Sequence, residues 1–175
     1  MWFYNNLQER GDCQNTCKSY RASQFVGWVV GCQQYPLSLL LNKVSLASAR
    51  AAVKLNQKEA ATAIKDLRPS IPYDLGSSGT VPECITLYLR GVAYLQQGSA
   101  SEAAAQFQKL IDHRGVNPIS IYWSLAHLQL ARAYAKTGDV DRSRTEYREF
   151  LTLWKEADPD IPILKQAKSE YANLV

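Results

Sequence analysis

The sequence has few of the features that mark a nucleic-acid-binding protein. Its 175 residues carry a net charge of only +4, and no run of five like charges occurs. Basic residues stand beside acidic ones, as in the stretch from Asp141 to Glu149. Nucleic-acid binders usually gather Lys and Arg on one face. We therefore interpret these charges as solvated helix faces and expect no nucleic-acid partner.

The sequence also lacks the spacing of a metal site. Its cysteines are Cys13, Cys17, Cys32 and Cys84. No second close pair follows the first two, and neither His113 nor His127 stands at a ligand spacing from them. Because structural zinc sites need such pairs, we expect no metal and no cofactor. A chain of this length does not need disulfides, so reduced cysteines in a cytosol-like compartment are the preferred interpretation.

Long apolar runs are absent. The stretch that suits lipid best, Gln24 to Cys32, is too short to cross a bilayer. The N-terminus from Met1 to Asn6 lacks the basic start and apolar stretch of a secretory signal. We expect no membrane span in this chain. An anchor upstream in a longer protein would place it outside the cytoplasm, so both locations stay open.

No constellation of catalytic residues is visible. No Ser or Cys has a recognisable base partner, and the Gly-rich loop and the His-Arg-Asp and Asp-Phe-Gly triplets of protein kinases are missing. Asp158 and Asp160 flank Pro159, which suits a turn better than acid–base chemistry. We expect that the chain is not an enzyme.

What the sequence does contain is a pattern that recurs at a spacing of forty residues. Each copy has a small residue, an aromatic residue and a glycine, followed by a second small residue, a second aromatic residue and an apolar residue. The two clear copies are Gly91, Tyr94, Gly98, Ala103, Phe107 and Leu110, and Ala131, Tyr134, Gly138, Ser143, Tyr147 and Phe150. Self-similarity at a fixed period indicates a repeat architecture.

A third copy, forty residues further toward the N-terminus, is degenerate. Lys58 stands at the glycine position and Lys54 at the aromatic position. Ala51, Ala63 and Leu67 keep the two small positions and the large one. We interpret the chain as two sound repeats and one worn repeat.

The residue types fit packed pairs of helices. Small residues let two helices approach closely, and aromatic rings fill the space between pairs. Gly98 and Gly138 end the first helix of a pair in a conformation that other residues disfavour. The stretches from Ser99 to Ser101 and from Asp139 to Asp141 then supply caps for the second helix. We predict an all-α fold of antiparallel helical hairpins stacked as a short solenoid.

The pattern small-x-x-Tyr-x-x-x-Gly-x-x-x-x-Ala-x-x-x-Phe resembles the tetratricopeptide repeat, a helix–turn–helix unit of about 34 residues. The resemblance implies a domain over 37–175, with repeats at about 44–77, 84–117 and 124–157 and a capping helix at 163–174. The additional residues per unit fall in the links, at 68–82, 112–120 and 157–162. One further departure is Arg90, where a Leu is usual.

The second half of the chain is also similar to one bacterial group. The stretches that carry the likeness are 107–115, 126–134, 150–155 and 157–165, and it extends over roughly residues 45 to 175. The group is the carboxy-terminal tetratricopeptide region of eukaryotic-like bacterial serine/threonine protein kinases and related winged-helix regulators. The likeness implies a regulatory or sensor module in signalling.

Residues 1–36 match nothing in the repeat. Frequent glutamines and aromatic residues, interrupted by Gly11, Gly27 and Gly31, predict an irregular or partly helical N-terminal segment. A helical hairpin, a poorly ordered leader and a non-native extension are the alternatives. A helix is expected from Pro36 through Leu55.

The resemblance implies a ligand site on the concave face made by the first helix of each pair. The positions on that face are Asn56, Tyr88, Val92, Gln96, Leu128, Arg132 and Lys136. Arg132 and Lys136 are four apart on one helix face, so they either bind a carboxylate jointly or remain two solvated cations. The positions of a carboxylate clamp hold Ser48, Ala52, Tyr88 and Val92 instead. An amphipathic or extended peptide on Tyr88, Val92 and Leu128 is therefore the expected ligand.

The two histidines are given structural roles. We expect His113 to cap the helix before it and His127 to pack between repeats. Two functions stay open: a scaffold that binds a protein or peptide partner, and a small-molecule sensor with a pocket between repeats. Self-association as a homodimer is a further alternative, because a worn first repeat leaves a surface that a second copy could cover.

Overall fold

The computed structural model describes residues 40–75, 84–116 and 118–174. The residues from Lys43 onward form one unit, and the description that follows concerns this unit. The irregular segment predicted at 1–36, with three of the four cysteines, lies outside the described residues. The predicted start of a helix at Pro36 also lies outside them.

The described residues form seven α-helices. They are α4 (Leu46–Asn56), α5 (Ala60–Leu67), α6 (Cys84–Gln97), α7 (Ala100–Asp112), α8 (Ile121–Thr137), α9 (Val140–Leu153) and α10 (Pro162–Ala172). A π-helical turn, η1 (Leu41–Ser45), precedes α4, and the 3₁₀ turns η2 (Arg68–Tyr73) and η3 (Arg114–Val116) follow α5 and α7. No strand occurs in these described ranges. The prediction of an all-α fold is confirmed.

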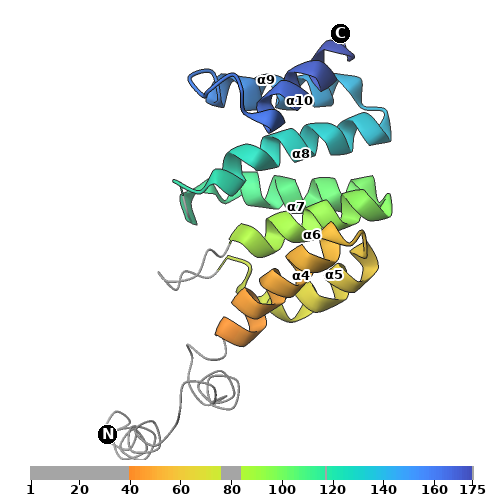
Figure 1. Ribbon diagram of the computed structural model, residues 1–175, viewed down its shortest axis with the longest axis vertical. Helices are drawn as coiled ribbons and strands as arrows, with labels where there is room; N and C mark the ends of the chain where they lie inside the picture. Colours follow the sequence, from red (N-terminus) through yellow and green to blue (C-terminus); the bar gives the residue numbers. More distant parts are fainter. Residues whose placement is uncertain (1–39, 76–83, 117, 175) are drawn as a thin grey trace, which may run out of the picture. The chain divides into compact units, whose positions relative to one another are not determined.

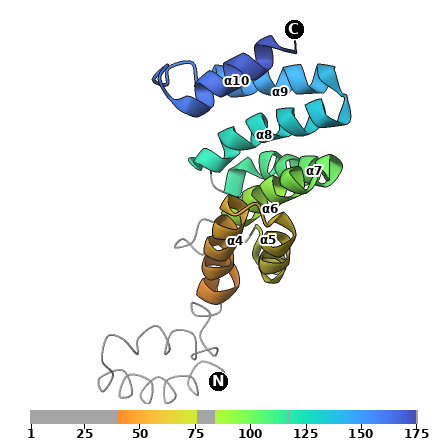
Figure 2. The same ribbon diagram turned by 45° about the vertical axis from the view of Figure 1, so that its right-hand side comes forward.

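The helices pack in sequence as antiparallel hairpins. The pairs α4–α5, α6–α7 and α8–α9 each make a hairpin, and α10 packs against α9. Neighbouring hairpins are joined through contacts of α4 with α6 and of α6 with α8. Figures 1 and 2 show the hairpins following one another along the stack, with α4 at one end and α10 at the other. The predicted solenoid arrangement is therefore present.

The small and large positions of the repeat meet in three buried clusters. Their shared property is near-complete burial, with no more than 2% of any of these side chains exposed: Ala51, Ala63 and Leu67; Ala103, Phe107 and Leu110; Ala131, Tyr147 and Phe150. Each buried Leu or Phe side chain contributes about 1.5–3 kcal/mol of transfer free energy. The degenerate first repeat thus keeps a core of the same kind as the other two.

Close approach of two helices explains the small residues. A methyl group placed on Gly91 would lie 2.5 Å from Cε1 and Cζ of the Phe107 ring, well inside van der Waals contact. In the next repeat the hydroxyl of Ser143 donates to the carbonyl oxygen of Ala131 at 2.9 Å, which joins α9 to α8. The pattern predicted a small residue at both places but not this hydrogen bond.

The turn that closes each hairpin has the same backbone conformation in all three repeats. Gly98 and Gly138 have φ angles of +90° and +82°, in the left-handed region predicted for them. Lys58, at the equivalent position of the first repeat, has a φ of 61° although it carries a side chain. A left-handed residue with a Cβ costs about 1–2 kcal/mol, so the worn repeat keeps the turn at an energetic cost.

Only one of the two predicted helix caps is made. Asp139 accepts a hydrogen bond from the backbone N–H of Arg142 at 3.1 Å and caps α9 as predicted. Ser99 precedes α7 with nearly the same backbone angles, but its side chain makes no capping hydrogen bond. The prediction of a capping side chain in front of α7 was therefore wrong at Ser99.

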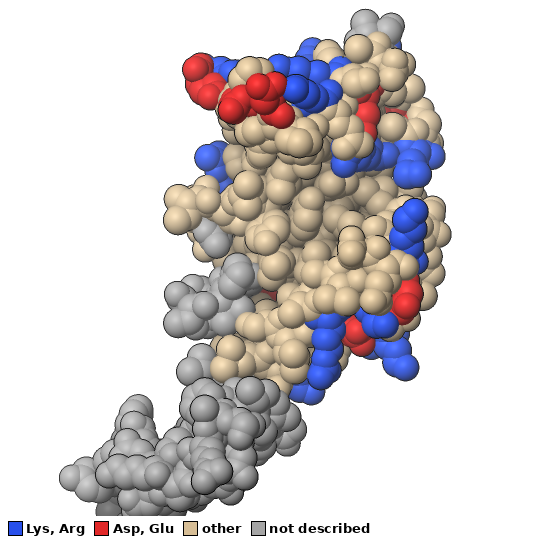
Figure 3. Space-filling model, in the orientation of Figure 1, with Lys and Arg blue, Asp and Glu red and all other residues tan. Residues whose placement is uncertain are grey.

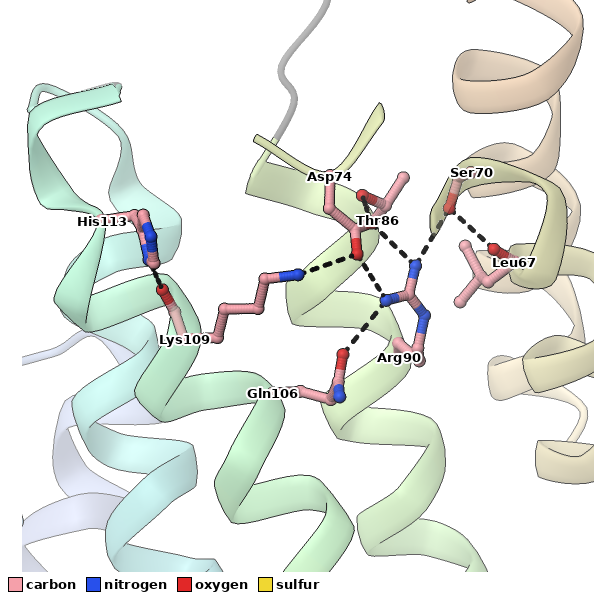
Figure 4. Close-up of polar contacts among 8 residues, drawn as sticks. All are labelled: Leu67, Ser70, Asp74, Thr86, Arg90, Gln106, Lys109 and His113. Atoms are coloured by element: carbon pink, nitrogen blue, oxygen red, sulfur yellow. Dashed lines mark hydrogen bonds and ion pairs between the residues drawn. The ribbon is translucent and has the colours of Figure 1, made fainter. Parts of the chain in front are cut away.

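The first link is held to the second repeat by Arg90. Its Nη1 and Nη2 donate to Oδ2 and Oδ1 of Asp74, both at 2.8 Å, and Nη2 also donates to the Ser70 hydroxyl at 3.1 Å. Gln106 Oε1 accepts from Nη1 at 3.1 Å, and the Thr86 hydroxyl donates to Asp74 at 3.2 Å (Figure 4). The arginine that departs from the repeat pattern is thus the centre of a polar cluster.

The last helix covers the end of the stack. Leu164 and Ala167 of α10 are buried against the α8–α9 hairpin, and Pro162 stands at its first turn. The predicted contact face at Ile163, Ala167, Tyr171 and Leu174 does pack there. Leu164, which is 1% exposed, is the larger of the two fully buried side chains of α10, and the periodicity did not identify it.

Candidate functional site

An open groove lies between α6, α8 and α10. Its volume is about 610 Å³, and its lining residues are Val92, Leu95, Gln96, Gln129, Arg132, Ala135, Lys136, Tyr147, Gln166 and Glu170. This volume falls within the range of about 300–1,000 Å³ that is usual for ligand pockets. Figure 3 shows uncharged surface over the centre of the described stack, with charged side chains toward its edges.

Four of the residues predicted to contact a partner line this groove. Val92 and Gln96 come from α6, and Arg132 and Lys136 come from α8. Within each helix the two residues are four apart, so they lie on one face. Because α6 and α8 pack side by side, the two faces form adjoining parts of one surface.

Tyr88 lies outside the groove, one helical turn before Val92. Its ring packs against Phe107 and Tyr122 with centroid separations of 5.9 and 5.2 Å, and its hydroxyl accepts from Nε2 of Gln129 at 3.3 Å. Burial raises the pKa of the Tyr88 hydroxyl, and the hydrogen bond with Gln129 lowers it by a smaller amount. Tyr88 therefore stays neutral and holds Gln129 in position at the groove wall.

Asn56 and Leu128 do not take part in the groove. Asn56 is exposed at the end of α4 and is not among the lining residues. Leu128 is 0% exposed, in a cluster with Tyr147 and Leu164. The expectation that Leu128 contacts a partner does not fit this structure, because α10 packs over the side of the hairpin where Leu128 lies.

Arg132 is paired rather than solvated. Its Nε and Nη2 donate to Oε2 and Oε1 of Glu170 at 2.8 and 3.1 Å. The Tyr147 hydroxyl donates to Oε2 at 2.9 Å, and Nε2 of Gln166 donates to Oε1 at 2.8 Å. One carboxylate from α10 thus receives four hydrogen bonds inside the groove. The sequence could not show this, because the placement of α10 on the hairpin was unknown.

The electrostatics of the groove follow from this arrangement. Burial raises the pKa of the Tyr147 hydroxyl, and its hydrogen bond to the Glu170 carboxylate raises it further. Tyr147 is thus a hydrogen-bond donor at neutral pH. Lys136 is exposed, and within the described part of the chain it has no ion-pair partner. The predicted joint site of Arg132 and Lys136 is therefore divided into a paired and an unpaired cation.

The histidines have structural partners. Nδ1 of His113 lies 2.8 Å from the carbonyl oxygen of Lys109, so His113 caps α7 as predicted. His127 is 8% exposed, and its Nδ1 lies 2.7 Å from Oε2 of Glu146. Its ring stands edge-on to Trp123 at 5.2 Å. His127 was expected to pack between repeats, whereas these two contacts lie within its own hairpin.

The described residues hold neither a metal-binding cluster nor a membrane-spanning helix. No group of three or more His, Cys, Asp or Glu side chains in these ranges is placed to hold a metal ion. None of the described helices has the length and apolar character needed to cross a bilayer.

Comparison with known proteins agrees with this geometry. Residues 86–113 and 125–156, which are the α6–α7 and α8–α9 hairpins, match the family model of the tetratricopeptide repeat. A tetratricopeptide repeat and J domain-containing co-chaperone of Fusarium oxysporum f. sp. lycopersici is 33% identical over 75 residues. That match covers 43% of this chain but only 13% of the relative. No solved structure matches the chain.

Proposed function

We propose that this chain binds an extended peptide segment of a protein partner, because its α6–α7 and α8–α9 hairpins match the tetratricopeptide repeat model and present a groove. The binding site is the groove between α6, α8 and α10. The chain acts as a scaffold and catalyses no reaction itself. The observation that carries the proposal is the open groove, whose lining combines apolar side chains with side-chain amides.

The chemistry of the lining suits a peptide. Val92, Leu95 and Ala135 are partly buried apolar residues that offer contacts to a ligand side chain. Gln96 and Gln129 each use the amide nitrogen in a hydrogen bond within the protein, to Leu55 and Tyr88. Their carbonyl oxygens are acceptors for backbone N–H groups of an extended chain.

The open shape of the groove favours a peptide over a small molecule. Small-molecule sites bury about 70–90% of the ligand surface, which an open hollow between helices does not do. An extended peptide instead makes contacts along the groove and leaves its other side in water. A thermal-shift screen with metabolites tests the small-molecule alternative, and a specific stabiliser would favour it.

The test is a binding measurement with a groove-filling variant. Peptides selected by display against the full chain are titrated by fluorescence polarisation. Ala135→Trp places an indole in the groove and is expected to weaken binding at least about tenfold, which is 1.4 kcal/mol. The matched control is Ala61→Trp, an exposed position on α5. Equal affinities of the two variants would refute binding in the groove.

We also propose that the array is a regulatory or sensor module related to bacterial signalling kinases. What supports this is the likeness of the stretches at 107–115, 126–134 and 150–155 to the repeat region of those kinases. The complete reading frame tests it. A kinase domain or a membrane span encoded upstream would favour the proposal, whereas a J domain would favour a co-chaperone instead.

A further inference from the structure

The donors around Glu170 form a complete carboxylate site. The guanidinium of Arg132 meets both carboxylate oxygens through two different nitrogens, which is the strong bidentate geometry. The Tyr147 hydroxyl and the Gln166 amide add one hydrogen bond each. These donors come from α8, α9 and α10, and all of them line the groove in which the peptide is proposed to bind.

We propose that Glu170 is an internal competitor for a carboxylate of the bound peptide. The inference rests on the proposed function, because the ligand must lie in the same groove. An acidic ligand group displaces Glu170, and then accepts hydrogen bonds from Arg132 and Tyr147 in its place. The Glu170 carboxylate thus occupies the anion-binding position of the protein until an acidic peptide segment binds there.

Accessibility permits this exchange. The side chains of Arg132 and Glu170 are 21% and 29% exposed, so water and an incoming ligand reach the pair from the groove. The Arg132–Glu170 pair is therefore not sealed from solvent. The Arg90–Asp74 pair differs, because its side chains are only 6% and 3% exposed. A second carboxylate that reaches the same donors gains the same bidentate geometry, so it competes with Glu170 on equal terms at Arg132.

Lys136 gives the incoming carboxylate an advantage over Glu170. It stands one helical turn beyond Arg132 in the same groove, and among the described residues it makes no ion pair with Glu170 or any other acid. A peptide with acidic groups meets both cations, whereas Glu170 is paired with Arg132 alone. The ligand thus gains an attraction that the internal carboxylate does not have.

The position of Glu170 in α10 keeps the exchange local. Leu164 and Ala167, earlier in the helix, carry the apolar contact that holds α10 on the hairpin. Glu170 lies in the last turn of α10, and Tyr171 and Leu174, which follow it, also pack on the hairpin. Release of the Glu170 carboxylate removes its four hydrogen bonds from this turn and leaves the apolar contacts of α10 in place.

The experiment compares variants in their binding of a defined acidic probe, fluorescein-labelled hexaglutamate, with hexaglutamine as the neutral probe. Glu170→Gln is expected to bind hexaglutamate about tenfold more tightly than the wild type, since the internal competitor is gone. The control is Glu149→Gln, an exposed position on α9 with the same change in charge. The gain should disappear when Arg132→Gln is added to Glu170→Gln, and binding of hexaglutamine should not change.

Equal hexaglutamate affinities for Glu170→Gln and Glu149→Gln would overturn the inference, as would a gain that persists without Arg132. A second measurement uses the wild-type protein and does not depend on how the variants fold. Saturating hexaglutamate should accelerate amide hydrogen exchange in residues 168–172 and leave α4 unchanged. Unchanged exchange in 168–172 would also refute the idea. The peptide-groove proposal is tested separately, because it predicts that Ala135→Trp weakens selected peptides whatever Glu170 does.

Discussion

The carboxylate of Asp74 and the guanidinium of Arg90 are joined by two hydrogen bonds of 2.8 Å, and both side chains are almost completely buried. Asp74 directly follows η2 in the first link, and Arg90 belongs to α6. The pair therefore fastens an irregular segment to the second repeat. Lys109 Nζ, 3.5 Å from Oδ2 of the same carboxylate, adds a second positive charge from α7.

This buried pair predicts an asymmetric response to mutation. Asp74→Ala leaves the guanidinium buried without its partner, so the free energy of unfolding should fall by about 3–5 kcal/mol. Asp74→Leu combined with Arg90→Met removes both charges and should cost much less. Urea denaturation measures both effects, with Arg50→Ala as a control at an exposed arginine. A double variant no more stable than Asp74→Ala would contradict this account.

The contact between Gly91 and Phe107 predicts intolerance of a single methyl group. Gly91→Ala forces the Phe107 ring or α6 to move, and overpacking of this kind costs about 1–3 kcal/mol. Gly115→Ala is the control, because nothing lies within 4 Å of the added carbon there. Thermal unfolding should show a lower midpoint for the first variant and little change for the second. Two equal midpoints would mean that the helices can separate freely at this point.

The left-handed turn at Lys58 predicts a stabilising substitution. Lys58→Gly relieves the strain of a side chain at a φ of 61°, worth about 1–2 kcal/mol. Glycine also has more conformational freedom in the unfolded chain, which reduces this stabilisation by about 0.4–1 kcal/mol. A small net increase in the free energy of unfolding is expected, measured by chemical denaturation. Gly138→Ala should have the opposite effect, and a destabilised Lys58→Gly would exclude strain at this turn.

The environment of Tyr147 predicts a loss of stability at alkaline pH. Burial and the hydrogen bond to Glu170 raise the pKa of Tyr147 in the folded protein above its value in the unfolded chain. The stabilisation from the neutral hydroxyl is complete below the unfolded pKa of about 10 and is lost as the pH rises through the folded pKa. Tyr147→Phe should therefore show a shallower decline above pH 10. Parallel curves for the wild type and the variant, recorded by denaturation at several pH values, would contradict the raised pKa.

Much of the fold could be predicted because the residues that form each helical hairpin recur at a spacing of forty residues. A small residue at Gly91 or Ala131 and a ring at Phe107 or Tyr147 are local requirements of two packed helices, and they recur at fixed spacing. The same spacing located Lys58 at a turn that has the same backbone conformation as the glycine turns. Residues that pack in the same way in each repeat therefore recur at the same spacing in the sequence.

The details of the candidate site depend on contacts that do not recur at a fixed spacing in the sequence. The placement of Val92 and Arg132 on one surface followed from the resemblance to the tetratricopeptide repeat. Pairing Arg132 with Glu170 required the position of α10, which follows a link and packs through Leu164. For the same reason Leu128 was expected at the surface, whereas it is covered by a helix that is distant in sequence. The hydrophobic pattern of α8 alone cannot distinguish a side chain that meets a partner from one that meets another part of the chain.

The small number of buried side chains in α10 has a consequence for engineering. In α10, two side chains, Leu164 and Ala167, are fully enclosed. A designed array could be lengthened at this point if the added helix carried a leucine and an alanine three positions apart. The same graft could keep or omit the acid at the position of Glu170. The length of such an array and the charge preference of its groove would then be separate design variables.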